Sequence, residues 1–108
     1  MPWTTLCELS ELEEGRGKYV EIGGFQLGVF LDNSQVYVTD NNCPHAGGDL
    51  AAGSIVEGCI VCPRHNWPFH LNNGQLRGSP GVAISTYRTR IVEPPERPKL
   101  VQAELPIF

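Results

Sequence analysis

Two short pairs of cysteine and histidine carry the clearest chemistry of the chain. Cys43 and His45 are separated by one residue, and Cys62 and His65 by two. Sixteen residues lie between the two pairs. Thiolate and imidazole are ligands that zinc and iron–sulfur clusters use in proteins. The two pairs therefore predict one metal site with four ligands supplied by two loops.

Prolines and glycines around both pairs favour loops with a fixed shape. Pro44 and Pro63 each follow a cysteine directly and fix a backbone angle there. Gly48 and Gly53 allow the backbone to approach a site closely. From ligand type alone, a tetrahedral zinc site and an iron–sulfur cluster both remain open.

The elements that must hold these loops are predicted to be β-strands. With 12 glycines and 9 prolines among 108 residues, the apolar stretches are short and separated by turn residues. The expected strands are residues 19–22, 26–31, 35–39, 54–57, 59–62, 68–71 and 84–91. Tight turns are expected at residues 23–24, 32–34 and 72–74, and one short helix at residues 7–14 with Ser10 as its cap. This pattern predicts an all-β fold, an antiparallel sandwich or small barrel.

Composition and charge exclude several classes of function. The 12 acidic and 8 basic residues give a formal charge of −4, and no cluster of lysine and arginine offers a face for nucleic acid. The N-terminal residues lack the pattern of a signal peptide, and no apolar stretch is long enough to span a membrane. We therefore expect a cytoplasmic protein with no nucleic-acid or membrane partner, in which the four cysteines remain reduced.

The motif CPHAGGDLAAG, followed by IVEGCIVCPRHNWPFHLNNGQL, resembles the Rieske pattern of Cys-x-His and Cys-x-x-His. The resemblance extends to WTTLCELSEL and SPGVAISTYRTRIVE, and so covers residues 3–92. Within the family, the HNW and LNNG elements are most similar to the small subunit of assimilatory nitrite reductase, and next to the ferredoxin component of aromatic-ring dioxygenases. The resemblance implies a Rieske-like sandwich or barrel with a cluster-binding subdomain of two loops. It predicts a Rieske domain at residues 1–92 and a proline-rich C-terminal extension at residues 93–108.

The same resemblance implies one Rieske-type 2Fe-2S cluster, with Cys43 and Cys62 on one iron and His45 and His65 on the other. The expected function is electron transfer from a reductase to a terminal oxidoreductase, with the partners docking at the His45/His65 edge. No nucleophile with a neighbouring base is evident, so we expect no catalytic residues and no catalysis by the chain alone. The alternatives are a dioxygenase ferredoxin, a zinc-bound module and a cluster-free structural subunit. The oligomeric state is not predicted.

The remaining candidates are assigned structural roles. Cys7 and Cys59 lie among apolar residues without a neighbouring histidine, and His70 is expected to have a polar or packing role. High-potential Rieske proteins carry a serine two residues and a tyrosine four residues past the second histidine, whose hydroxyls donate to the cluster sulfurs. Trp67 and Phe69 occupy these positions here, which predicts a reduction potential near the low end of the Rieske range.

Overall fold

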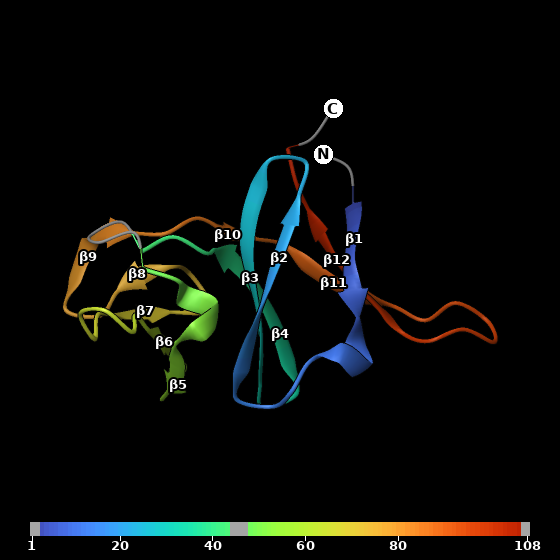
Figure 1. Ribbon diagram of the computed structural model, residues 1–108, viewed down its shortest axis with the longest axis horizontal. Coiled ribbons are helices and arrows are strands. Elements are labelled where there is room, and N and C mark those ends of the chain that lie inside the picture. Colours follow the sequence, from blue (N-terminus) through green and yellow to red (C-terminus); the bar gives the residue numbers. More distant parts are fainter. Residues whose placement is uncertain (1–2, 44–47, 107–108) are drawn as a thin grey trace.

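The computed structural model describes residues 3–43 and 48–106, which form three antiparallel sheets (Figure 1). The first sheet has the order β1-β12-β11, with strands Trp3–Glu8, Leu100–Glu104 and Thr89–Val92. The second has the order β10-β4-β3-β2, with strands Thr86–Tyr87, Gln35–Asp40, Phe25–Asp32 and Arg16–Ile22. The third has the order β5-β6-β7-β8-β9, with strands Ser54–Val56, Cys59–Val61, Pro68–His70, Gln75–Leu76 and Ser79–Ala83. Two short 3-10 helices, η1 (Leu9–Glu11) and η2 (Leu50–Ala52), complete the described elements.

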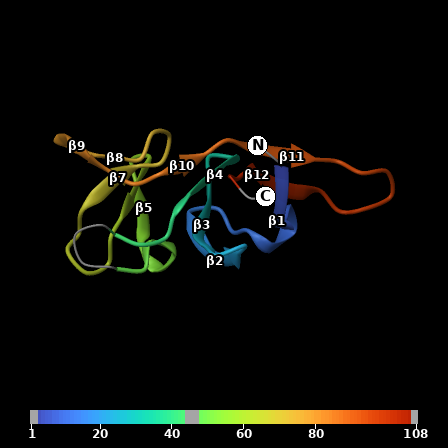
Figure 2. The ribbon, with the colours of Figure 1, turned by 90° about the horizontal axis from the view of Figure 1, so that it is seen from above.

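The first two sheets form a sandwich, and the third belongs to a small subdomain, residues 48–85, that lies beside it (Figure 2). This architecture confirms the predicted all-β, antiparallel fold. Six of the seven expected strands appear with small shifts at their ends. No helix among the described residues has the length and apolar character needed to cross a membrane.

Two expectations about secondary structure are wrong. Residues 7–14 do not form a helix, because β1 extends to Glu8 in antiparallel pairing with β12, and only η1 follows, with Glu8 rather than Ser10 as its cap. The expected strand at residues 84–91 is divided into β10 and β11. The division arises because β10 pairs with β4 of the second sheet, whereas β11 pairs with β12 of the first.

The sandwich core lies between the first and second sheets. It contains buried side chains from β1, β3, β4 and β12, together with Leu12 and Leu105. The tight turn between β3 and β4 matches the sequence prediction, since Asn33 and Ser34 have φ of 51° and 64°. Asn33 and Ser34 also donate backbone hydrogen bonds to the carboxylate of Glu14, at 2.6 and 3.2 Å.

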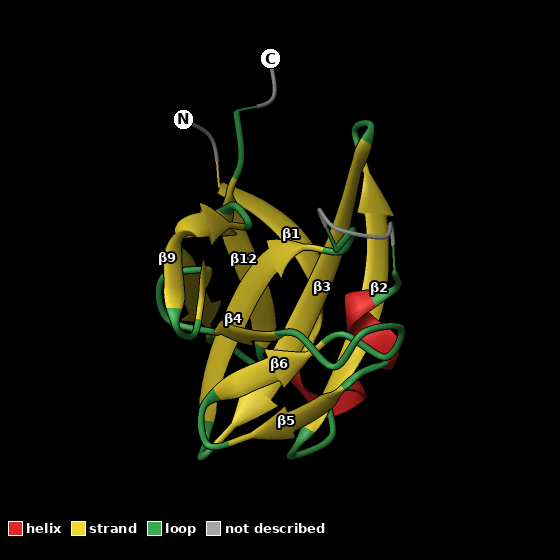
Figure 3. Cartoon of the chain, turned by 90° about the vertical axis from the view of Figure 1, so that its left-hand side faces the viewer, coloured by secondary structure: helices red, strands yellow, loops and turns green. Residues whose placement is uncertain are grey.

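Phe30 of β3 joins the sandwich to the small subdomain. Its ring is fully buried and belongs to the apolar core of the small subdomain rather than to that of the sandwich. The ring lies over two glycines: a Cβ at Gly17 or Gly28 would come within 2.6 or 2.7 Å of its atoms. At Gly17 a Cβ would also meet the carbonyl oxygen of Ala51 in η2 at 2.8 Å. These two glycines therefore allow η2 and Phe30 to pack directly on the backbone of the second sheet. The short helices lie beside β2 in Figure 3.

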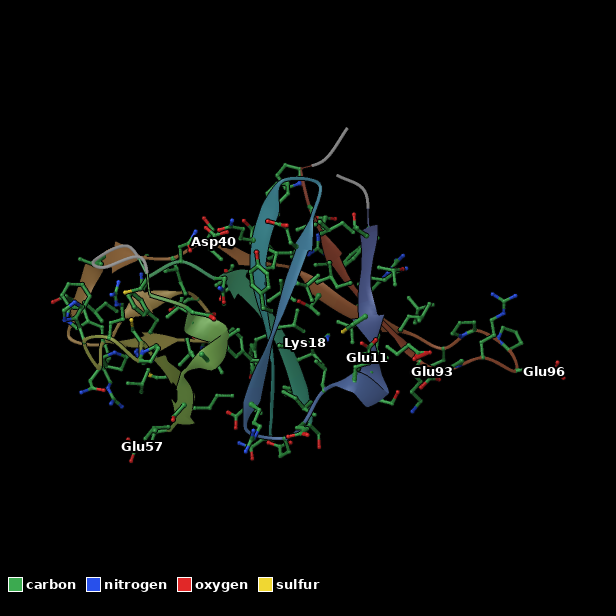
Figure 4. All side chains as sticks on the ribbon, in the orientation of Figure 1. Glu11, Lys18, Asp40, Glu57, Glu93 and Glu96 are labelled. Carbon is green, nitrogen blue, oxygen red and sulfur yellow. The ribbon has the colours of Figure 1, made fainter. Side chains whose placement is uncertain are left out.

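The C-terminal residues contribute a strand to the sandwich. β12 is the central strand of the first sheet, with β1 on one side and β11 on the other. The division into residues 1–92 and 93–108 therefore separates β12 from the sheet in which it lies. Between β11 and β12 the chain forms a connection that carries Glu93 and Glu96 and extends away from the small subdomain (Figures 1 and 4).

Candidate metal centre

The second loop, residues 62–67, connects β6 to β7 and buries Cys62. The backbone N–H of Cys62 donates to the carbonyl of Trp67 at 2.9 Å, and the N–H of Asn66 donates to the carbonyl of Cys62 at 2.8 Å. Asn66 adopts a left-handed φ of 57°, which asparagine tolerates better than most residues. Cys62 is fully buried, whereas His65 is exposed. The loop thus places a thiol inside the subdomain and an imidazole at its surface.

The first loop begins where β4 ends. Cys43 is 1% exposed, and its backbone N–H donates to the carbonyl of Gly48 at 3.0 Å. This bond joins the two ends of the loop. Asp40, which is labelled in Figure 4, precedes the loop. It accepts a hydrogen bond from the Tyr87 hydroxyl at 2.6 Å. His45, the remaining predicted ligand, lies outside the described residues, as does the rest of the segment 44–47.

The two loops meet at Gly48. A Cβ on this residue would lie 2.8 Å from Sγ of Cys62 and 3.1 Å from Cγ of Arg64. The approach of the first loop to the sulfur of the second loop therefore depends on the absence of a side chain at position 48. Cys43 and Cys62 share one buried core with seven apolar residues: Phe30, Leu50, Ile60, Phe69, Leu71, Leu76 and Ile84.

This arrangement fits a mixed iron–sulfur cluster better than a solvent-exposed metal site. Two soft sulfur donors lie in an apolar core, a glycine leaves room beside one of them, and an imidazole from the same loop reaches the surface. Such a donor set suits a cluster with one iron on thiolates and the other on histidines. The described residues alone contain no group of three or more histidine, cysteine or carboxylate side chains placed to hold a metal ion.

The other two cysteines lie elsewhere. Cys7 belongs to the sandwich core, and burial, together with the nearby Glu11 carboxylate, raises the pKa of its thiol to about 11. Sγ of Cys59 lies 3.4 Å from Nδ1 of His70 on the paired strand β7, and burial raises the pKa of this thiol too. Cys7 and Cys59 are free thiols. A raised pKa disfavours the thiolate that binds metals, so both groups remain predicted structural residues.

Trp67 and Phe69 have packing positions next to the loop. Phe69 is fully buried in the core that contains the two loop cysteines, and Trp67 packs against that core. Their ring centroids are 6.4 Å apart, with the planes tilted by 48°. Neither side chain carries a hydroxyl group that could donate to a sulfur.

Sequence reasoning missed the residues that join the base of the first loop. The side chain of Asn41 bonds to Asp49 and to the backbone of Ala51, both on the far side of the loop. Asparagine and aspartate are common in any surface turn, so their types gave no signal. Only their positions on either side of Cys43 and Gly48 distinguish them.

Comparison with known proteins agrees with this geometry. The family profile of the Rieske [2Fe-2S] domain matches residues 2–88. Apoptosis-inducing factor 3 of Mus musculus is 32% identical over 78 residues, which are 72% of this chain but 13% of that protein. The chain therefore spans about an eighth of the length of this curated relative.

Two solved structures share the fold over nearly the whole chain. A protein described as the small subunit of an NADH-dependent nitrite reductase from Mycobacterium tuberculosis has a TM-score of 0.85 and 25% identity, covering 98% of this chain and 97% of that one. A chain in the complex of oxygenase and ferredoxin of carbazole 1,9a-dioxygenase has a TM-score of 0.78 and 25% identity, covering 94% and 91%. These matches support an electron carrier. The chain belongs to the Rieske [2Fe-2S] domain family, and its cofactor is a Rieske-type 2Fe-2S cluster.

Proposed function

We propose that the chain carries single electrons on a cluster held by Cys43 and Cys62 at one iron and by His45 and His65 at the other. The observation that carries the ligand assignment is the contact of Gly48 with Sγ of Cys62, because it brings the two motif loops together. The burial of both cysteines and the exposure of His65 suit the thiolate and imidazole sides of such a cluster.

The mixture of ligands sets the charge of the centre. Two ferric irons, two sulfides and two thiolates sum to a neutral oxidised cluster, whereas four thiolates would leave a dianion. When bound, the cluster would supply one-electron redox chemistry. Two neutral imidazoles in place of two thiolates make the cluster less negative, so that it accepts an electron more readily. Cys43 and Cys62 in turn exclude water from the sulfur side, since both lie in an apolar core.

We propose that redox partners dock at the His45/His65 edge. His65, Arg64 and Asn66 are all exposed at this end of the small subdomain, so a partner can approach the imidazole closely. Approach from the other side is obstructed by the apolar core of the subdomain and by the sandwich. The complex of a similar ferredoxin with its oxygenase is a precedent for a redox partner.

The proposed partner system is that of an assimilatory nitrite reductase, in which this chain is the small subunit. The HNW and LNNG elements and the match over 97% of a nitrite reductase small subunit support this choice. The second candidate is the ferredoxin component of a ring-hydroxylating dioxygenase, favoured by the similarity to the carbazole dioxygenase complex. We also propose a cytoplasmic location, since Cys7 and Cys59, the two cysteines outside the proposed ligand set, are free thiols of the kind that reducing compartments maintain.

The ligand set is tested by metal analysis and low-temperature EPR after reduction. We expect two irons per chain and an EPR signal of mixed histidine and cysteine ligation, lost in Cys43→Ser, Cys62→Ser, His45→Ala and His65→Ala. Cys7→Ala and Cys59→Ala are matched controls that keep iron and signal. One zinc per chain without a signal would establish the zinc module, and absence of both metals the cluster-free subunit.

The partner is tested by electron transfer in a reconstituted system. We expect the reduced protein to be reoxidised by a nitrite reductase catalytic subunit in the presence of nitrite. Faster reoxidation by a ring-hydroxylating oxygenase with its aromatic substrate would favour the dioxygenase assignment. Loss of transfer in a surface variant that retains the cluster, such as Arg64→Glu, would support docking at the exposed edge.

A further inference from the structure

The first loop is joined at its base by a set of hydrogen bonds centred on Asn41. Nδ2 of Asn41 donates to Oδ1 of Asp49 at 2.8 Å, and Oδ1 of Asn41 accepts from the backbone N–H of Ala51 at 2.8 Å. The backbone carbonyl of Asn41 accepts from the N–H of Leu50 at 2.9 Å. One side chain and its own peptide group therefore bind three consecutive residues on the opposite side of the loop.

Asn41 is itself fixed to the second sheet. Its backbone N–H donates to the carbonyl of Gln26 at 2.9 Å, and the residue is only 5% exposed. Its Oδ1 lies against β3, where a Cβ on Gly28 would be 3.4 Å away. Within the described part of the chain, no buried side-chain nitrogen or oxygen lacks a hydrogen-bond partner. The position of Asn41 is thus set by the sandwich, and Asn41 in turn sets the position of the loop ends.

The residues that Asn41 holds are those next to the sulfurs. Asn41 lies two residues before Cys43, and its partner Asp49 directly follows Gly48. Gly48 accepts the hydrogen bond from the Cys43 N–H and faces Sγ of Cys62. Gly48 therefore links the position of Asp49 to Cys43 and Cys62, the two cysteines of the proposed ligand set.

We propose that Asn41 is a positioning residue for the cluster. It fixes the position of Cys43 relative to Gly48 on the opposite side of the loop. The inference rests on the proposed ligand set, since it acts through Cys43 and Cys62. An ordinary buried asparagine would contribute to folding alone. A positioning residue also determines how tightly iron is retained and what EPR line shape the reduced cluster gives.

The polarity of the Asn41–Asp49 pair provides a selective test. Asn41→Asp is nearly isosteric but replaces the donor Nδ2 by an oxygen that faces the Asp49 carboxylate, so the pair repels. Asp49→Asn alone preserves the bond, because Nδ2 of Asn41 can donate to the new amide oxygen. The double variant N41D/D49N exchanges the roles, so that the amide at position 49 donates to the carboxylate at position 41.

The control is Asn42→Asp, which adds the same charge one residue closer to Cys43. Asn42 is exposed, and its side chain donates to Oε1 of Gln26 rather than across the loop. The measurements are the rate of iron release to a ferrous chelator, the EPR line shape of the reduced protein, and the thermal unfolding of the cluster-free forms.

We expect N41D to release iron roughly ten- to a hundredfold faster than N42D. The reason is that N41D loses a hydrogen bond at a buried residue and leaves the Asp49 carboxylate without this donor. Its EPR line should be broadened or shifted, and the double variant should restore both properties toward wild type. If N41D folds without any cluster, recovery of the cluster in the double variant decides the question.

Equal iron release from N41D and N42D would overturn the proposal, as would failure of the double variant to recover. Loss of thermal stability in N41D with unchanged iron release and EPR line would also overturn it, because only a folding role would remain. A wild-type protein that contains zinc or no metal is a different result, which refutes the ligand set first.

Discussion

Gly48→Ala is the substitution for which the structure gives the most direct magnitude. The new Cβ would stand 2.8 Å from Sγ of Cys62. Carbon atoms in contact prefer about 3.5–4.0 Å and sulfur is larger, so a separation of 2.8 Å must increase by at least about 0.7 Å. The Arg64 stem, whose Cγ is 3.1 Å away, is flexible and can yield. The sulfur is held more firmly, because Cys62 is fully buried and both its peptide groups are hydrogen-bonded within the loop.

Overpacking of this kind typically costs about 1–3 kcal/mol. In a domain of this size, that cost lowers the melting temperature of the cluster-free protein by at least about 4 °C. The greater effect is expected in iron content, since the displaced atom is a proposed ligand. The assay is iron per chain and EPR after reconstitution, together with thermal unfolding of the cluster-free form.

The matched control is Gly81→Ala. A Cβ at Gly81 would meet no atom within 4 Å, and its φ is not left-handed. Gly81→Ala should therefore keep full iron content and the wild-type signal. If Gly48→Ala binds as much iron as Gly81→Ala, with the same EPR signal and melting temperature, then the two loops do not meet as described.

The remaining predictions concern the potential and the thiols. Phe69→Tyr places a hydroxyl in the core that holds the loop cysteines, where it can donate to a sulfur of the cluster. The reduction potential of the wild-type protein is expected near about −150 mV. Phe69→Tyr should raise it by about 60 mV for each ~1.4 kcal/mol by which the new hydrogen bond favours the reduced state. The potentials are measured by voltammetry. If the Phe69→Leu control has the same potential as Phe69→Tyr, the hydroxyl is not the cause of the change. The raised pKa of Cys7 keeps its thiol neutral in the folded state while the unfolded thiol ionises, so the free energy of unfolding should fall as pH rises from 9.0 to about 11. Urea titrations of Cys7→Ala should show a smaller alkaline loss than wild type, and an identical slope would show that the thiol is not linked to folding.

Much of the fold followed from local signals in the chain. The turns at residues 23–24, 32–34 and 72–74 have Asn, Asp, Ser and Gly chemistry that permits tight hairpins, and the strands between them were located within a few residues. Strands β1, β8, β9 and β12 were not predicted. A two-residue strand such as β8 has too little periodicity to detect, the sequence of β9 contains a proline and a glycine, and the prolines around residues 93–98 conceal the strand that follows them.

The errors arise where pairing with a distant strand decides the conformation. Residues 7–8 read as the start of a helix because of the acidic residues that follow, yet they pair with Val101 and Leu100 of β12. The apolar and polar alternation of residues 84–91 looked like one strand, but the chain moves from the second sheet to the first within it. Local propensity is weaker than burial on a sheet, so tertiary pairing prevails at both places.

By itself the sequence determined the family and the identity of the candidate ligands, because the spacing of cysteine and histidine and the turn residues are local properties of the chain. The tertiary structure alone decided three features. These are the meeting of the two loops at Gly48 and Cys62, the hydrogen bonds of Asn41 across the loop base, and the central place of β12 in its sheet. Each depends on residues that are distant in sequence or on a separation of a few ångströms. No pattern of residue types specifies such a distance, because it is set by how the sandwich and the small subdomain pack around Phe30.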